Sequence, residues 1–232
     1  MSKKWFTTAV VAAVGVAAVW GLFRFNYGPY SGSYGTYLLV NMVGLLFVPM
    51  LSVLLLFRAD ADEFGFAPSA SRRAWVWVGI LFAGLFVMML IASHWPRFQD
   101  YYPIFRRFDE FGRFGSLAAF ADYPRANPFT AAPWVMLYAE LSYGLYLFCW
   151  EFFFRGYLLF GLRRSLGSIA AVLLQAAAFG LMHYGKPEMV PSFGAGIILG
   201  ILALYARSFV PGFVLHWAAA VVFDVLIVAA RR

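Results

Sequence analysis

Apolar runs long enough to cross a membrane recur along the whole chain. About 20 apolar residues in a helix span the ~30 Å of hydrocarbon in a bilayer. Lipid offers the backbone no hydrogen bonds, so a spanning segment must form a helix or join a closed barrel. We predict spanning helices over residues 5–23, 37–57, 74–92, 133–162, 168–183, 191–205 and 210–230.

The composition excludes an ordinary soluble domain. The 232 residues are 63% hydrophobic and 12% charged, whereas soluble domains are ~45–50% apolar and ~25% charged. The net charge of +7 does not indicate a nucleic-acid partner, because the basic residues mostly flank apolar runs, as topological anchors do. Cys149 is the only cysteine, which excludes a disulfide framework. We predict an all-α, polytopic membrane helix bundle of about seven to eight spans, with residues 1–232 as one domain.

Basic residues at the two ends of the chain give conflicting topologies. Lys3 and Lys4 precede the first apolar run and favour a cytoplasmic N-terminus. Seven spans would then leave Arg231 and its neighbour outside, against the charge rule, so an eighth, re-entrant crossing within 93–133 is the alternative. Residues 104–120 alternate aromatic and charged side chains, which predicts an amphipathic helix in the interface plane. Either topology describes a multi-pass protein, of the cell (inner) membrane if the source is bacterial.

One apolar stretch carries two opposite charges. Glu151 and Arg155 are four residues apart, so they share one helix face and can pair. A charge at the bilayer centre costs about 2.5–3.5 kcal/mol on insertion scales, which marks such a pair as a candidate functional site. The alternative is mutual neutralisation inside the bundle. Glu140, eleven residues earlier, is expected near the opposite interface, where solvent would explain it.

Two later helices add imidazoles. His183 follows Phe179 by one turn, and His216 in the last span precedes Asp224 by about two turns. Together with Glu151, these groups from consecutive helices favour a polar reaction cavity. They offer a general base, a neutral imidazole to share a water, and donors for an oxyanion, which is the chemistry of acyl-bond hydrolysis.

At these residues the chain resembles the CPBP (CaaX protease and bacteriocin-processing, or Abi) family of intramembrane proteases. The family pattern is Glu-Glu-x-x-x-Arg, then Phe-x-x-x-His, then His-x-x-x-Asn or Asp. Glu151 and Arg155 match the second glutamate and the arginine, Phe179 and His183 match the second motif, and His216 matches the third.

The resemblance covers about residues 133–232, which would form the catalytic core, and it has two departures. Trp150 stands at the position of the first glutamate, and Ala220 at the position of the Asn or Asp. The chain therefore resembles a variant with a single glutamate in the first motif.

The resemblance implies roles for the matching residues. Glu151 and His183 would activate water, and His216 would stabilise the oxyanion. Asp224 would replace the missing Asn as the group that orients His216. Lys186 and Glu188 would border the mouth of the cavity.

The resemblance thus implies an intramembrane endopeptidase of glutamic type that uses no cofactor and no metal. Its partners would be the lipid bilayer and a membrane-anchored protein or peptide substrate. One alternative is a catalytically silent member that binds a membrane peptide or partner in immunity or sorting. Another is a proton-coupled transporter with a Glu151, His183 and His216 relay. A zinc enzyme is a variant of the first hypothesis, since one Glu and two His form a known ligand set, although no His-Glu-x-x-His motif occurs.

Overall fold

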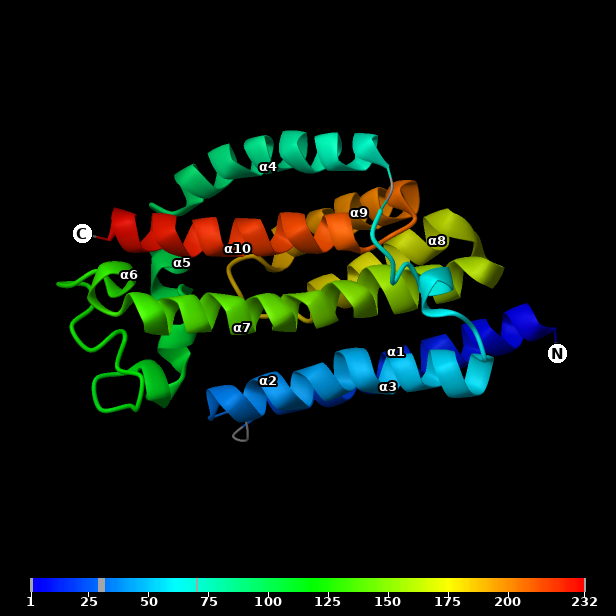
Figure 1. Ribbon diagram of the computed structural model, residues 1–232, viewed down its shortest axis with the longest axis horizontal. Helices are drawn as coiled ribbons and strands as arrows, with labels where there is room; N and C mark the ends of the chain where they lie inside the picture. The colour runs from blue at the N-terminus through cyan, green and yellow to red at the C-terminus, as the bar shows by residue number, and fades with distance from the viewer. Residues whose placement is uncertain (1, 29–31, 70, 232) are drawn as a thin grey trace.

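The computed structural model describes residues 2–28, 32–69 and 71–231, and every regular element in these ranges is a helix. Short 3-10 helices connect the long α-helices (Figure 1). Some of the long helices contain π-helical stretches. The elements are α1 (Lys3–Asn26), α2 (Tyr34–Met42), η2 (Val43–Phe47), α3 (Val48–Leu51), η3 (Ser52–Phe57), η4 (Ala61–Phe64), α4 (Arg72–Ala92), α5 (Pro96–Tyr101), η5 (Ile104–Arg107), η6 (Asp109–Phe111), α6 (Pro128–Ala131), α7 (Pro133–Glu151), η7 (Phe152–Leu158), α8 (Leu159–Leu181), α9 (Met189–Ala206) and α10 (Val210–Ala230).

Six helices in the described ranges are long and apolar enough to cross a membrane, which confirms the predicted fold class. The longest joins α7, η7 and α8, and it reverses at Gly167, whose φ of 78° and ψ of 168° suit glycine. Contacts with α1 show the reversal. Before it, the chain passes Gly15 in the middle of α1, beside Leu158. Thr8 near the start of α1 donates to the Gly161 carbonyl at 3.2 Å, and Tyr27 beyond its end donates to the Tyr184 carbonyl at 2.7 Å. One of the six helices therefore crosses twice, giving seven crossings, and the termini lie at opposite ends of the bundle (Figure 1).

The second span contains a proline, Pro49, without losing its helix. Pro49 lies in α3, between the π-helical stretches η2 and η3, so residues 34–57 stay helical throughout. A π-turn is one way for a helix to absorb a residue that cannot donate its i→i−4 hydrogen bond.

The segment between α4 and α7 is neither an eighth crossing nor one amphipathic helix, so both expectations for it were wrong. It contains short helices and turns, and three of its phenylalanines, Phe105, Phe108 and Phe111, are buried. Their rings lie 6.0, 5.1 and 5.1 Å from the ring of Tyr34 at the start of α2. The phenylalanines therefore cap one end of the bundle core, and the chain must break at intervals to place all three there.

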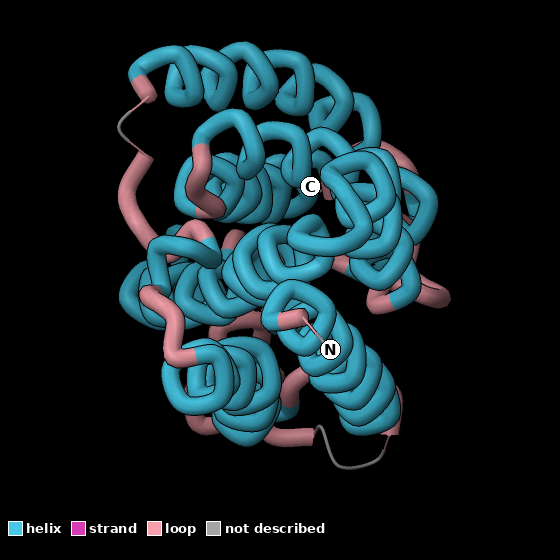
Figure 2. The backbone as a smooth tube through the Cα atoms, turned by 90° about the vertical axis from the view of Figure 1, so that its right-hand side faces the viewer, coloured by secondary structure: helices cyan, strands magenta, loops and turns pink. Residues whose placement is uncertain are grey.

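The helices differ in how deeply they are embedded. The most apolar window of α9 is 39% buried in the protein and that of α4 only 11%. Helix α4 packs on α10 and α9 and lies at the edge of the bundle in both views (Figures 1 and 2). A cavity opens between α4 and the more central α7, α9 and α10.

Candidate functional site

The cavity has a volume of about 670 Å³ and combines apolar walls with a few ionisable groups. Helix α4 supplies aliphatic side chains, and α7 supplies Tyr143, Tyr146 and Trp150. Six of the predicted site residues also line it: Phe179, His183, Lys186, Glu188, His216 and Asp224. A concave apolar site with few polar groups is typical of a ligand or substrate pocket.

Glu151 lies behind this wall and does not line the cavity. Its Oε1 accepts hydrogen bonds from Arg155 at 2.9 Å and from Nδ1 of His216 at 2.8 Å. Glu151 and Arg155 are both 0% exposed. The local pairing predicted from their spacing is therefore present even though η7 intervenes, and His216 makes the second contact from 65 residues away.

The start of α10 packs against the same carboxylate. A Cβ placed on Gly212, in the first turn of α10, would lie 3.3 Å from Glu151 Oε2. The absence of a side chain thus lets the helix N-terminus, which carries partial positive charge, approach the acid. Arg155, His216 and this helix end thus surround the Glu151 carboxylate with hydrogen-bond donors and positive charge.

The contact with Glu151 defines the tautomer of His216. An ionised carboxylate is an acceptor, so Nδ1 carries the hydrogen and Nε2 of the neutral ring is left as an acceptor. The His216 side chain is 23% exposed and borders the cavity. Its buried nitrogen is therefore held by Glu151 and its other nitrogen is available for chemistry.

His183 is arranged in the same way by a different partner. Its Nδ1 lies 2.8 Å from the carbonyl oxygen of Phe179. A carbonyl only accepts, so Nδ1 donates and Nε2 is again the acceptor. Burial, followed by the charge of Lys186, holds the pKa of His183 well below its ordinary value. The cavity thus contains two imidazoles whose Nε2 atoms are unoccupied by these contacts.

Phe179 is the aromatic centre of the site. Its ring centroid lies 4.7 Å from that of His183 and 6.0 Å from that of His216. The guanidinium carbon of Arg155 lies 4.0 Å from the Phe179 centroid, within cation–π range. One ring therefore contacts both imidazoles and covers the buried arginine.

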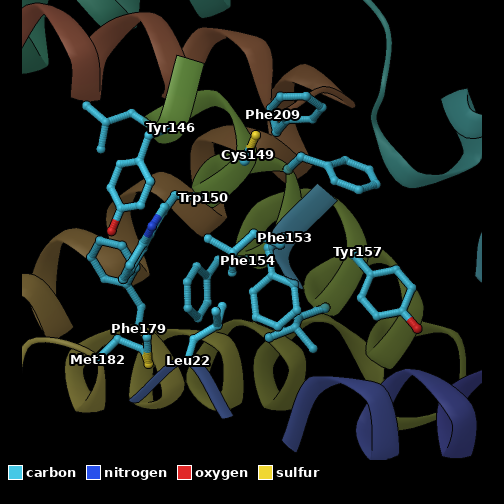
Figure 3. Close-up of a cluster of buried hydrophobic side chains, with 14 of the residues drawn as sticks. Leu22, Tyr146, Cys149, Trp150, Phe153, Phe154, Tyr157, Phe179, Met182 and Phe209 are labelled. Atoms are coloured by element: carbon cyan, nitrogen blue, oxygen red, sulfur yellow. The ribbon is translucent and has the colours of Figure 1, made fainter. Parts of the chain in front are cut away.

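Trp150 occupies the position of the family's first glutamate. It is 3% exposed, and its ring lies 5.7 Å from Phe179 and 5.6 Å from His183. Figure 3 shows it with Tyr146 and Phe154 in one aromatic cluster. The indole thus places an apolar surface beside His183 where the family pattern has a carboxylate.

Asp224 has a different neighbour from the one expected. It interacts electrostatically with Glu140 of α7, and no hydrogen bond joins it to His216 in the described residues. Glu140 is 6% exposed, which corrects the expectation that solvent explains this residue. The nearby Trp217 packs α10 onto α7 by donating to the Glu140 carbonyl at 3.0 Å. Glu151 therefore orients His216, and Asp224 forms a separate buried carboxyl pair.

Lys186 and Glu188 lie on the loop between α8 and α9. Burial lowers the pKa of Lys186 to about 8, against the opposing effect of Glu188. Burial also raises the pKa of Glu188, which Lys186 in turn lowers. Both side chains line the cavity, so this loop brings charge to an otherwise apolar site.

The tyrosines of the wall were not among the predicted site residues. Tyr143, Tyr146 and Trp150 recur at intervals of three and four residues, which places them on one face of α7. That spacing was a usable signal, although the same pattern also fits ordinary core packing. In the described residues, no group of three or more His, Cys, Asp or Glu side chains is arranged to hold a metal ion.

Comparison with known proteins identifies one family. Residues 129–222 match the family model described as type II CAAX prenyl endopeptidase Rce1-like. No curated protein and no solved structure matches the chain. The matched range holds the Glu151 and Arg155 pair, His183 and His216. Together with the apolar helices, the match indicates an integral membrane protein that is similar, over residues 129–222, to the Rce1-like family of CAAX-type proteases.

Proposed function

We propose that this chain is an intramembrane endopeptidase of glutamic type that cuts a peptide bond of a membrane-anchored protein or peptide in the cavity. The observation that carries the proposal is the contact of 2.8 Å between Glu151 and His216, with the far side of His216 bordering the cavity. A buried carboxylate that orients a histidine is the arrangement by which many hydrolases make an imidazole a base. The family match supports the same class of enzyme.

The first step is attack by water on the scissile carbonyl. Water would be held by Nε2 of His183 and Nε2 of His216, both of which are acceptors. His216 takes one proton from the water as the new C–O bond forms, because the Glu151 carboxylate stabilises the imidazolium that results. His183 orients the water through its other hydrogen. Glu151 thus acts through His216, which refines the expectation that it touches water itself.

The second step is collapse of the tetrahedral intermediate. Protonated His216 now carries hydrogen on Nε2 and donates it first as a hydrogen bond to the oxyanion, as the family resemblance implies. It then transfers the proton to the leaving amine as the C–N bond breaks. The site returns to neutral His216, a new carboxyl terminus and a released amine, so atoms and charges balance.

Incubation of the purified protein with candidate membrane peptides tests this function. We expect cleavage by the parent protein and loss of cleavage in His216→Ala, with helicity and thermal unfolding retained. A parallel arm with a chelator reports on metal dependence. Cleavage by His216→Ala at the parent rate would contradict the proposal.

A second candidate is a catalytically silent member that binds a membrane peptide. The observation that favours it is the pair of differences around the base: Glu151 does not reach the cavity, and Trp150 fills the position of the first glutamate. Peptide binding without cleavage under any condition would support this alternative.

A further inference from the structure

Lys186 is placed differently from the other lysines of the chain. Lys3 and Lys4 begin α1, whereas Lys186 lines the cavity from the loop between α8 and α9. The Lys186 N–H donates to the carbonyl of His183 at 3.0 Å and closes a turn. The two Cα atoms are therefore within about 7 Å of one another. An ammonium and a catalytic imidazole share one rigid turn.

The Lys186 ammonium has no ion-pair partner within the described ranges. Glu188 is near enough to favour its charge but does not pair with it directly. With its pKa lowered to about 8, Lys186 remains predominantly protonated at pH 7. A partly desolvated cation without a close counter-ion is unfavourable, and an anionic ligand would relieve it.

A second cation strengthens the positive charge at this end of the cavity. Arg107 donates to the Tyr101 hydroxyl at 3.1 Å and lies 5.6 Å from its ring centroid. Tyr101 lines the cavity, and the charge of Arg107 acts on Lys186. The charges that act on Lys186 are thus one further cation, Arg107, and one carboxyl group, Glu188, whose own charged form burial disfavours. Such a site attracts anions.

We infer that Lys186 is a specificity-determining residue that binds a carboxylate of the substrate, close in sequence to the bond that is cut. The relation to the cut bond rests on the proposed function. An extended peptide advances ~3.3–3.6 Å per residue, so the turn from His183 to Lys186 corresponds to roughly one to three residues. A peptide supplies the carboxylate as its C-terminus or as an Asp or Glu side chain.

The test compares peptides that differ in one carboxylate. One pair shares a sequence and ends in a free acid or an amide. A second pair is amidated and carries Asp or Asn within the last three positions. In one of the two pairs, we expect the peptide with the carboxylate to have a KM and a Kd roughly tenfold lower than those of the peptide without it. The neutral peptide lacks a charge-assisted hydrogen bond. The pair that shows the preference identifies the source of the carboxylate.

Variants assign the preference to Lys186. Lys186→Met should abolish it, Lys186→Arg should retain it, and the matched control Lys4→Met should behave as the parent in preference and in kcat. Equal affinity of the parent for both members of both pairs would overturn the inference, and so would an undiminished preference in folded Lys186→Met.

Binding and cleavage separate the two proposals. Direct binding to the parent protein in lipid nanodiscs reports on Lys186 even if no peptide is cut. A Lys186-dependent preference in binding without cleavage would support the inference and contradict the proposed protease. Cleavage that requires His216 but shows no carboxylate preference would support the protease and contradict the inference.

Discussion

The two halves of the bundle bury polar groups in opposite ways. In the N-terminal half the buried polar side chains of the described residues are neutral, and so are their partners. Asn26 donates to Asn41 at 3.0 Å, and Ser52 donates to the Tyr157 hydroxyl at 2.8 Å. In the C-terminal half a full ion pair, Glu151 with Arg155, is completely buried.

The difference indicates which half of the chain buries groups with a high desolvation cost. Neutral amide and hydroxyl pairs satisfy the polar groups of packed membrane helices at modest cost. A buried ion pair must recover the desolvation of two charges, and well-packed apolar residues would often be as stable. The ion pair is therefore expected where function needs it, and α1 to α3 serve as the support against which that half packs.

The largest expected effect is the loss of activity when the charge of Glu151 is removed from the C-terminal half. We expect Glu151→Gln to lower kcat by about 10²–10⁴-fold, because His216 loses the charge that stabilises its imidazolium. His183→Ala should cause a loss of similar order. Initial rates on a cleaved membrane peptide measure both. Parent-like rates in Glu151→Gln would show that the carboxylate is a structural counter-ion only.

Removal of the buried cation should have the largest effect on stability. In Arg155→Met, Glu151 keeps its contacts with His216 and the start of α10 but loses its ion pair. Breaking a buried ion pair lowers the free energy of unfolding by about 3–5 kcal/mol. The double variant Glu151→Gln, Arg155→Met should recover part of this loss, because neither charge is then left unpaired. Thermal unfolding in detergent measures the changes. A double variant less stable than both single variants would refute the pairing argument.

The pH dependence of substrate binding should report Lys186. The pKa of Lys186 is lowered to about 8, so its charge is present below that pH and is lost as the pH rises through it. The affinity for a carboxylate peptide should therefore fall severalfold between pH 7 and pH 9. His183, whose pKa is held well below this range, should not contribute.

Two variants distinguish the titration of Lys186 from that of neighbouring ionisable groups. Lys186→Arg should abolish the decline, since its guanidinium stays charged. Glu188→Gln removes the one carboxyl group that acts on Lys186 and should leave a decline in the same direction. An unchanged decline in Lys186→Arg would assign it to another group.

Trp150→Glu tests the departure from the family pattern. We expect activity to be retained or raised within a few fold, because a carboxylate beside His183 would add a second acceptor for water. Trp150→Gln is the matched control for the lost indole, and the comparison of kcat values at equal folding separates charge from packing. Complete inactivity in the Glu variant alone would show that the site needs the apolar surface of Trp150.

The N-terminal half should give the smallest effect. Asn41→Ala removes a neutral hydrogen-bonded pair with Asn26 and should lower stability by about 1 kcal/mol while kcat stays within twofold. A large loss of activity at the same stability would mean that this half shapes the site directly.

Several features could be predicted from sequence because they are local. Apolar run length determined the spans, and Arg163 with Arg164 followed by Gly167 marked the reversal. The pairing of Glu151 with Arg155 depends on a separation of four residues along one helix. Local spacing gave a wrong prediction for the segment between α4 and α7. There the phenylalanines pack against Tyr34 of a distant helix and do not form one face of an amphipathic helix.

The sequence by itself therefore determined the membrane class and the ionisable residues of the C-terminal half, and it left the number of crossings at seven or eight. Only the tertiary structure decided which of them touch. His216 contacts Glu151, Asp224 faces Glu140, and the cavity is walled by helices that are far apart in the chain. The physical reason is that a helix presents several side chains to its surroundings. The rotation and depth at which it packs against its neighbours select the contacts, and those depend on the whole bundle.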